Sequence, residues 1–232
     1  MDEAEFDKFA LEYRNLHAAN IRASGETPEY FAEYKVIDLA AELRKAGAAP
    51  PAPKVLDFGA GVGYSVPFFA RHLPAARLTC LDVSKRSLEL GASQHGSRAE
   101  FVHFDGARIP YDDDSFDAAL ASCVFHHIPH AEHVVLLAEI RRVLKPGGVL
   151  TVFEHNPLNP LTRHAVNTCE FDEHAELILA PTMRKRVRDA GFGSVAIRYR
   201  IFFPHALRAL RGLEPHLTWL PLGAQYYVVA RK

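Results

Sequence analysis

The sequence predicts an α/β fold built on a parallel sheet with helices on both faces. From residue 54 onward, short apolar segments of strand length alternate with amphipathic segments of helix length, a pattern typical of βαβ units. The first apolar segment runs into a turn with glycine at every second position, Gly59, Gly61 and Gly63. Turns of this kind at the carboxyl end of a first parallel strand hold nucleotide-like ligands in open α/β sheets.

The N-terminal region is expected to be helical. Phe6, Phe9, Tyr13 and Leu16 recur at three- and four-residue steps, as one face of a helix requires. Thr27-Pro28-Glu29 is a helix-start signal. We therefore expect residues 1–50 to form a helical extension that closes over the main domain, residues 51–232, with Tyr13 as a candidate lid residue.

Alternation of apolar strands and amphipathic helices defines the middle of the chain. The expected strands are 55–58, 77–82, 99–104, 116–122 and 149–154, and the expected helices are 64–73, 84–94 and 131–144. Ser84 is a plausible N-cap for the second helix. The last helix should end at Lys145-Pro146-Gly147-Gly148.

The last third is less regular. Residues 155–180 contain two Asn-Pro steps and are expected to form an irregular loop. A helix over 181–190 should precede two strands, 195–203 and 225–230, which are expected hairpin partners. An apolar insertion, residues 204–223, separates these strands.

Composition narrows the function classes. The chain has 232 residues and a net charge of −1, which argues against a nucleic-acid-binding protein because such proteins carry a basic face. Its three cysteines fit no zinc spacing, and the set indicates reduced thiols in a cytoplasmic protein. No apolar run reaches membrane-spanning length. Nothing in the sequence indicates an oligomeric state.

The glycine spacing separates the nucleotide-binding alternatives. A phosphate-binding P-loop needs Gly-Lys-Ser/Thr, which is absent, and the dinucleotide fingerprint G-x-G-x-x-G fails when counted from Gly59 or from Gly61. The turn, with Asp57 ahead of it, instead resembles the first motif of class I S-adenosylmethionine (SAM)-dependent methyltransferases. An acid there suits the ammonium of SAM.

Later segments strengthen the resemblance. Residues 122–128 and 144–150 are similar to later motifs of the same family, especially its ubiquinone-biosynthesis branch. The resemblance covers about residues 51–154. It implies a Rossmann-like three-layer sandwich, a seven-stranded sheet with an antiparallel last strand, and SAM as cofactor, converted to S-adenosylhomocysteine. The implied cofactor-binding residues are Asp57, Phe58, Gly59, Ala60, Gly61, Asp82, Val83, Asp105, Gly106, Cys123 and Tyr13.

Two of these acids have specific expected roles. Asp82 closes the second strand about twenty residues after Gly61, the spacing at which an acid meets a ribose diol. A carboxylate accepts from both hydroxyls, although Asp82 could instead cap the next helix. Asp105 could accept from the adenine amino group, and the alternative is an Asx-turn.

Histidines follow the fourth and fifth strands at the expected active-site edge. His127 or His155, and then His126, are candidates for a general base, because histidine titrates near neutral pH. The alternative is that these rings only pack beside the cofactor. A metal site formed by His126, His127, Glu154 and His155 is a further alternative. It is not expected, because adjacent residues such as His126 and His127 rarely share one ion.

The sequence says least about the acceptor. The insertion 204–223 places leucines and Trp219 beside Arg208 and Arg211. It could be a membrane-surface contact, but a cover over the substrate cleft or core is favoured. The leading hypothesis is methyl transfer to a small molecule, at an oxygen of an apolar or lipid-linked metabolite, with carbon or nitrogen as alternative acceptor atoms. The alternatives are a non-catalytic SAM-binding protein and an NAD-dependent oxidoreductase.

Overall fold

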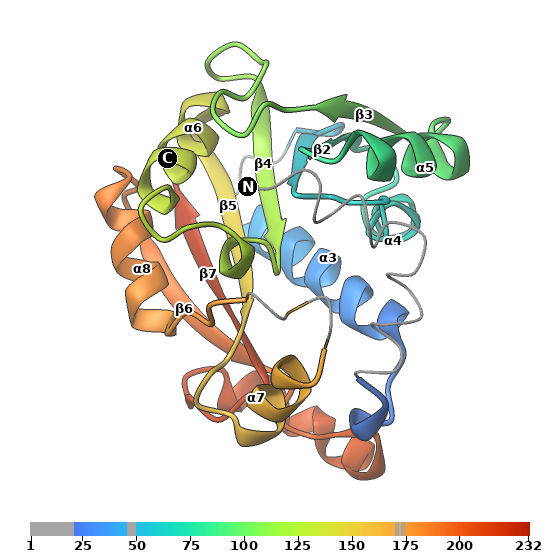
Figure 1. The fold of residues 1–232 in the computed structure, drawn as a ribbon, viewed down its shortest axis with the longest axis vertical. Coiled ribbons are helices and arrows are strands. Elements are labelled where there is room, and N and C mark those ends of the chain that lie inside the picture. The colour runs from blue at the N-terminus through green and yellow to red at the C-terminus, as the bar shows by residue number, and fades with distance from the viewer. Residues whose placement is uncertain (1–20, 46–49, 170–171, 173–174) are drawn as a thin grey trace.

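In a computed structural model, residues 21–45, 50–169, 172 and 175–232 are described. Within them, seven strands form one sheet in the order β3-β2-β1-β4-β5-β7-β6 (Figure 1). The strands are β1 Lys54–Phe58, β2 Arg77–Asp82, β3 Ala99–His103, β4 Phe116–Ser122, β5 Leu144–His155, β6 Val195–Arg200 and β7 Gln225–Arg231. β7 runs antiparallel to both of its neighbours, and the other pairs are parallel. The predicted fold is confirmed.

Helices cover both faces of the sheet. Side chains of α3 and α4 pack in one buried cluster, and those of α6 and α8 in another. The α-helices are α3 Pro28–Lys45, α4 Val66–His72, α5 Lys85–His95, α6 His133–Val143, α7 Pro160–Asn167, α8 Ala180–Asp189 and α9 Glu214–Leu217; the 3₁₀ segments are η1 Ile21–Ser24, η2 Phe125–His127 and η4 His205–Leu213. Ser84 caps α5 as expected, accepting from the Ser87 backbone N–H at 3.0 Å.

The parallel strands deliver their carboxyl ends to one edge. β1, β2, β4 and β5 end there at Phe58, Asp82, Ser122 and His155. Because β7 is antiparallel, it starts where β5 ends, and Gln225 pairs with His155. The predicted hairpin partnership of the last two strands is confirmed by the pairing of β6 with β7. This edge therefore collects side chains from both halves of the chain.

One expected loop contains a helix. Residues 155–180 include α7, so the prediction of an irregular loop was wrong there. Asn159 accepts from the backbone N–H groups of Leu161 and Thr162, and Pro160 stands in the first turn. Asn at the N-cap followed by Pro is a helix-start signal. From the sequence alone, the same Asn-Pro step indicates an irregular loop.

The insertion 204–223 lies largely on the surface. No residue of η4 is buried, and the Trp219 side chain is 72% exposed. Core packing, one of the three interpretations, is therefore wrong for η4. None of the helices among the described residues combines the length and the apolar character needed to cross a membrane. Tyr13, the candidate lid residue, lies outside the described residues.

Candidate active site

A cavity of about 350 Å³ opens at the carboxyl edge of the sheet. The turns after β1, β2 and β4 line it on one side. α3, α7 and the start of β7 line it on the other. Its size is that of an ordinary small-molecule site. The predicted site residues that line it are Asp57, Phe58, Gly59, Ala60, Gly61, Asp82, Val83, Cys123, His126, His127 and His155.

The glycine turn needs glycine for two different reasons. Gly59 and Gly61 have φ of 73° and 53°, a region that side chains with a Cβ enter only at a cost. A Cβ on Gly59 would also lie 2.5 Å from the Val124 side chain, whereas one on Gly61 would meet nothing within 4 Å. The first glycine thus lets β1 pack against the β4 turn, and the second leaves the backbone open to the cavity.

Asp82 ties this turn to the next helix. Its Oδ2 accepts from the Gly61 backbone N–H at 2.8 Å, and its Oδ1 accepts from the Ser84 backbone N–H at 2.9 Å. Each carboxylate oxygen can accept more than one hydrogen bond. Asp82 can therefore bond to the start of α5 and still accept hydrogen bonds from a ligand in the cavity.

Asp57 is buried beneath the turn with 3% of its surface exposed, and the Ser65 hydroxyl donates to its Oδ2. Burial raises the pKa of this carboxyl to about 7, although the hydrogen bond from Ser65 lowers it. Asp57 is therefore an acid that changes charge near neutral pH at the floor of the cavity.

Asp105 and Gly106 do not line the cavity. Asp105 Oδ1 accepts from the backbone N–H groups of Ala107 and Arg108, both at 2.9 Å, which is the Asx-turn alternative. Gly106 has φ of 84°, as such a turn requires. The structure thus brings the first two acid positions together and leaves the third at the surface.

Cys123 stands in a strained position after β4. Its φ is 57° although it is not glycine, and the Lys35 ammonium lies 3.1 Å from its Sγ. Burial raises the pKa of the thiol, but Lys35 and His155 outweigh that effect and lower it to about 7. Lys35 could not be predicted as a site residue, because it is a single buried lysine within the amphipathic helix α3.

His155 is held at the end of β5. Its Nδ1 lies 3.3 Å from Gln225 Nε2, and the Tyr34 hydroxyl donates to the other end of that amide. Sequence reasoning missed Gln225. Its first position in β7, opposite the last position of β5, becomes informative only once the antiparallel register is known.

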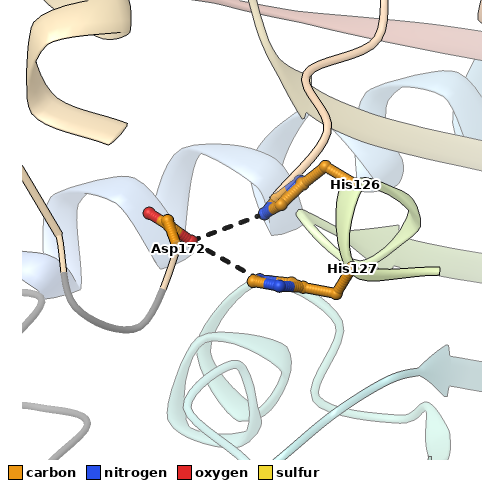
Figure 2. Close-up of side chains that lie close together, drawn as sticks. All are labelled: His126, His127 and Asp172. Atoms are coloured by element: carbon orange, nitrogen blue, oxygen red, sulfur yellow. Dashed lines mark ion pairs between the residues drawn. The ribbon is translucent and has the colours of Figure 1, made fainter. Parts of the chain in front are cut away.

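The two other histidines form a cluster with Asp172 (Figure 2), and His126 also contacts Glu154. His126 Nδ1 lies 2.5 Å from Glu154 Oε2, and Glu154 Oε1 accepts from the Phe125 backbone N–H at 2.8 Å. Asp172 Oδ1 faces both rings, at 3.7 Å from His126 Nε2 and 3.5 Å from His127 Nε2. Asp172 was missed because it lies in a segment without periodicity.

The cluster shifts the pKa values of its two histidines in opposite directions. Burial lowers the pKa of His126, but the charge of Glu154 and the hydrogen bonds to both acids outweigh it and raise the pKa well above its usual range. Burial and the neighbouring His126 charge lower the pKa of His127. His126 is therefore engaged by two carboxylates, whereas His127 is a neutral ring.

Comparison with known proteins agrees with this architecture. Residues 55–148 match the family described as a methyltransferase domain. A demethylmenaquinone methyltransferase from Clavibacter sepedonicus is 37% identical over 122 residues, 51% of this chain and 48% of that protein. A phthiotriol/phenolphthiotriol dimycocerosates methyltransferase from Mycobacterium ulcerans is 33% identical over 109 residues, 47% of this chain and 40% of that protein. The chain thus spans about half the length of these relatives or less.

A solved structure extends the likeness of fold to nearly the whole chain. A SAM-dependent methyltransferase from Thermotoga maritima, described as a possible histamine N-methyltransferase, superposes with a TM-score of 0.66 at 19% identity. The match covers 99% of this chain and 98% of that one. Residues 55–148 are thus similar to a methyltransferase domain, and the whole chain shares its fold with solved SAM-dependent methyltransferases.

The two glycines should respond differently to the same substitution. Gly59→Ala adds overpacking against Val124 to the backbone cost, so we expect it to lower the free energy of unfolding by about 2–4 kcal/mol. Gly61→Ala carries the backbone cost alone, about 1–2 kcal/mol. Urea denaturation of both variants measures the difference. Equal losses would contradict the packing role assigned to Gly59.

Proposed function

We propose that this chain, through the methyltransferase domain that residues 55–148 form, transfers the methyl group of SAM to an oxygen of an apolar small molecule. The observation that carries the proposal is one cavity in which the glycine turn, Asp57 and Asp82 face His155 and the start of β7. Methyl transfer from a sulfonium needs chiefly alignment of nucleophile, methyl and sulfur, which a cavity with rigid walls supplies.

The cofactor side of the cavity suits the parts of SAM. Gly61, where a Cβ would meet no protein atom, lets the ligand approach the backbone. Asp82 at the end of β2 accepts from the ribose diol, and the buried Asp57 carboxylate balances the ammonium of the methionine end, directly or through water. Asp57 must be ionised to do so.

The affinity for SAM should therefore fall as the pH falls. Above about pH 7 Asp57 is already charged, whereas below it binding must first remove a proton, so the affinity should drop by up to about tenfold per pH unit. Calorimetry with S-adenosylhomocysteine from about pH 8.5 to about pH 5.5 measures this dependence. Asp57→Asn should bind weakly with a flat pH profile, and Asp112→Asn, an exposed acid outside the cavity, should behave like the parent. A flat profile for the parent would remove Asp57 from this role.

On the acceptor side we assign the proton transfer to His155. His126 has both ring nitrogens directed at carboxylates, so it is a positioning residue. His155 lines the cavity, and Gln225 orients its ring. A base at this position would take the proton of an acceptor hydroxyl as the methyl group arrives.

Replacing His155 should slow turnover and leave cofactor binding intact. We expect His155→Gln to lower kcat by about 10²–10⁴-fold, with the affinity for S-adenosylhomocysteine unchanged. His164→Gln, on the exposed face of α7 and outside the cavity, is the matched control. The assay follows S-adenosylhomocysteine released with phenolic and aliphatic hydroxyl acceptors. Parent-level turnover by His155→Gln would refute this assignment. SAM binding without turnover of any acceptor would favour a non-catalytic SAM-binding protein.

An exposed apolar surface lies beside the cavity, and we call it the apolar rim. It comprises Leu158, Leu161, Leu207, Leu210, Leu213, Trp219 and Leu222. Leu161 also lines the cavity, and Asn159 donates to the Leu222 carbonyl, which joins the α7 and insertion parts of the rim. Apolar side chains with a tryptophan and nearby arginines are typical of a membrane-interface contact. We propose that the rim rests on a lipid surface and admits an apolar acceptor.

Charges placed in the rim should weaken vesicle binding. We expect the parent to bind phosphatidylglycerol vesicles in sedimentation assays. Leu210→Glu with Trp219→Glu should reduce that binding by at least about tenfold, because charged side chains are costly at an apolar interface. Val135→Glu, at an equally exposed apolar site on α6, is the control and should bind normally. No binding by the parent, or equal loss in the control, would remove the membrane proposal.

A further inference from the structure

We propose that His126, His127 and Asp172 bind a divalent transition-metal ion at the wall of the cavity. Each residue offers one ligand atom, and these three atoms lie within 4.8 Å of one another. They come from two separate parts of the chain, the η2 turn and the segment before α8. Figure 2 shows both rings directed at the Asp172 carboxylate. All three residues line the cavity.

The distances from the Asp172 carboxylate to the two rings are close to those between ligand atoms of one ion. Asp172 Oδ1 lies 3.7 Å and 3.5 Å from the two Nε2 atoms. Donor atoms held about 2.1 Å from one ion are about 3–3.5 Å from each other. A small inward movement of the side chains would complete the set.

The 3₁₀ turn removes the objection raised from the sequence. Adjacent residues rarely share an ion, because a strand points them to opposite faces. In η2 the His126 and His127 rings instead lie side by side, with centroids 4.2 Å apart and planes tilted by 47°. The expectation of no metal site, made from adjacency alone, does not take this turn into account.

A second layer of contacts fixes the first ligand. Glu154 forms a hydrogen bond with His126 Nδ1 and also accepts one from the Phe125 backbone N–H. A histidine that donates from Nδ1 to a carboxylate presents Nε2 as a ligand atom, and such carboxylate–histidine pairs commonly support metal ligands. The carboxylate also makes the ring a stronger ligand.

Charge and ligand type point to the class of ion. The Glu154 and Asp172 side chains are 1% and 9% exposed and place two negative charges beside the histidine rings. A divalent cation would balance these two charges. Two imidazoles with one carboxylate favour Zn²⁺, Fe²⁺ or Co²⁺ over Mg²⁺ and Ca²⁺. Three protein ligands leave positions open to the cavity. If the proposed methyl transfer holds, an acceptor oxygen would take one of them and ionise more easily.

The test uses the full chain, freed of metal with a chelator and titrated with Co²⁺. We expect one ion per chain and visible absorption bands that Zn²⁺ displaces. His127→Asn and Asp172→Asn should each weaken binding by at least about a hundredfold. His130→Asn should bind normally, because His130 pairs with Glu176 on the surface and is not part of the cluster. His126 is left in place, because removing it would strand the buried Glu154.

Three results would overturn the proposal. These are no stoichiometric Co²⁺ binding, parent-like binding in both cluster variants, and loss in the His130→Asn control. In the first case the cluster is an ion pair that holds a proton instead of a metal. Calorimetry with S-adenosylhomocysteine on the same samples separates this outcome from failure of the proposed function. Cofactor binding without metal defeats only the metal site, and metal binding without cofactor defeats only the methyltransferase assignment.

Discussion

The geometry of the candidate site depends on one buried carboxylate, Glu154. It accepts from the Phe125 backbone N–H with one oxygen and engages His126 with the other. These contacts join the end of β5 to the turn after β4, so two neighbouring strands present their side chains as one surface. Replacing a partner of such a group leaves a charge without compensation, which costs several kcal/mol. The position of the histidine cluster therefore follows from β5 as much as from the turn that carries it.

The turns after β1 and β2 that line the cavity could be predicted because their information is local. Gly59, Gly61 and Asp82 follow strands whose apolar patterns are plain in the sequence, and parallel strands bring their carboxyl ends to one edge. A positive φ favours glycine, and a backbone N–H that bonds to a carboxylate requires an acid at a fixed spacing, so both features can be recognised in the sequence. Asp105 shows the limit of this reasoning, because its position fits adenine binding and an Asx-turn equally well. Its hydrogen bonds in the structure are those of the turn.

The opposite side of the cavity depends on contacts between segments far apart in sequence. Lys35, Asp172 and Gln225 reach the site from α3, from the segment before α8 and from β7, and none stands in a motif. Their roles depend on register: Gln225 meets His155 only because β7 pairs antiparallel with β5. The exposure of the insertion 204–223 could not be predicted either. An apolar composition fits a buried or an exposed segment, and only the positions of the neighbouring segments decide between the two.

The sheet order also has a consequence for how the chain acquires this site during synthesis. β7 lies between β5 and β6, yet both of those strands precede it in the sequence. Until β7 leaves the ribosome, β5 presents an open hydrogen-bonding edge and β6 has no partner in the sheet. The glycine turn and Asp82 belong to strands that are paired earlier. A nascent chain should thus complete the glycine-turn side of the cavity first. It should depend on β7, or on a chaperone covering that edge, for the side that His155 and Gln225 form.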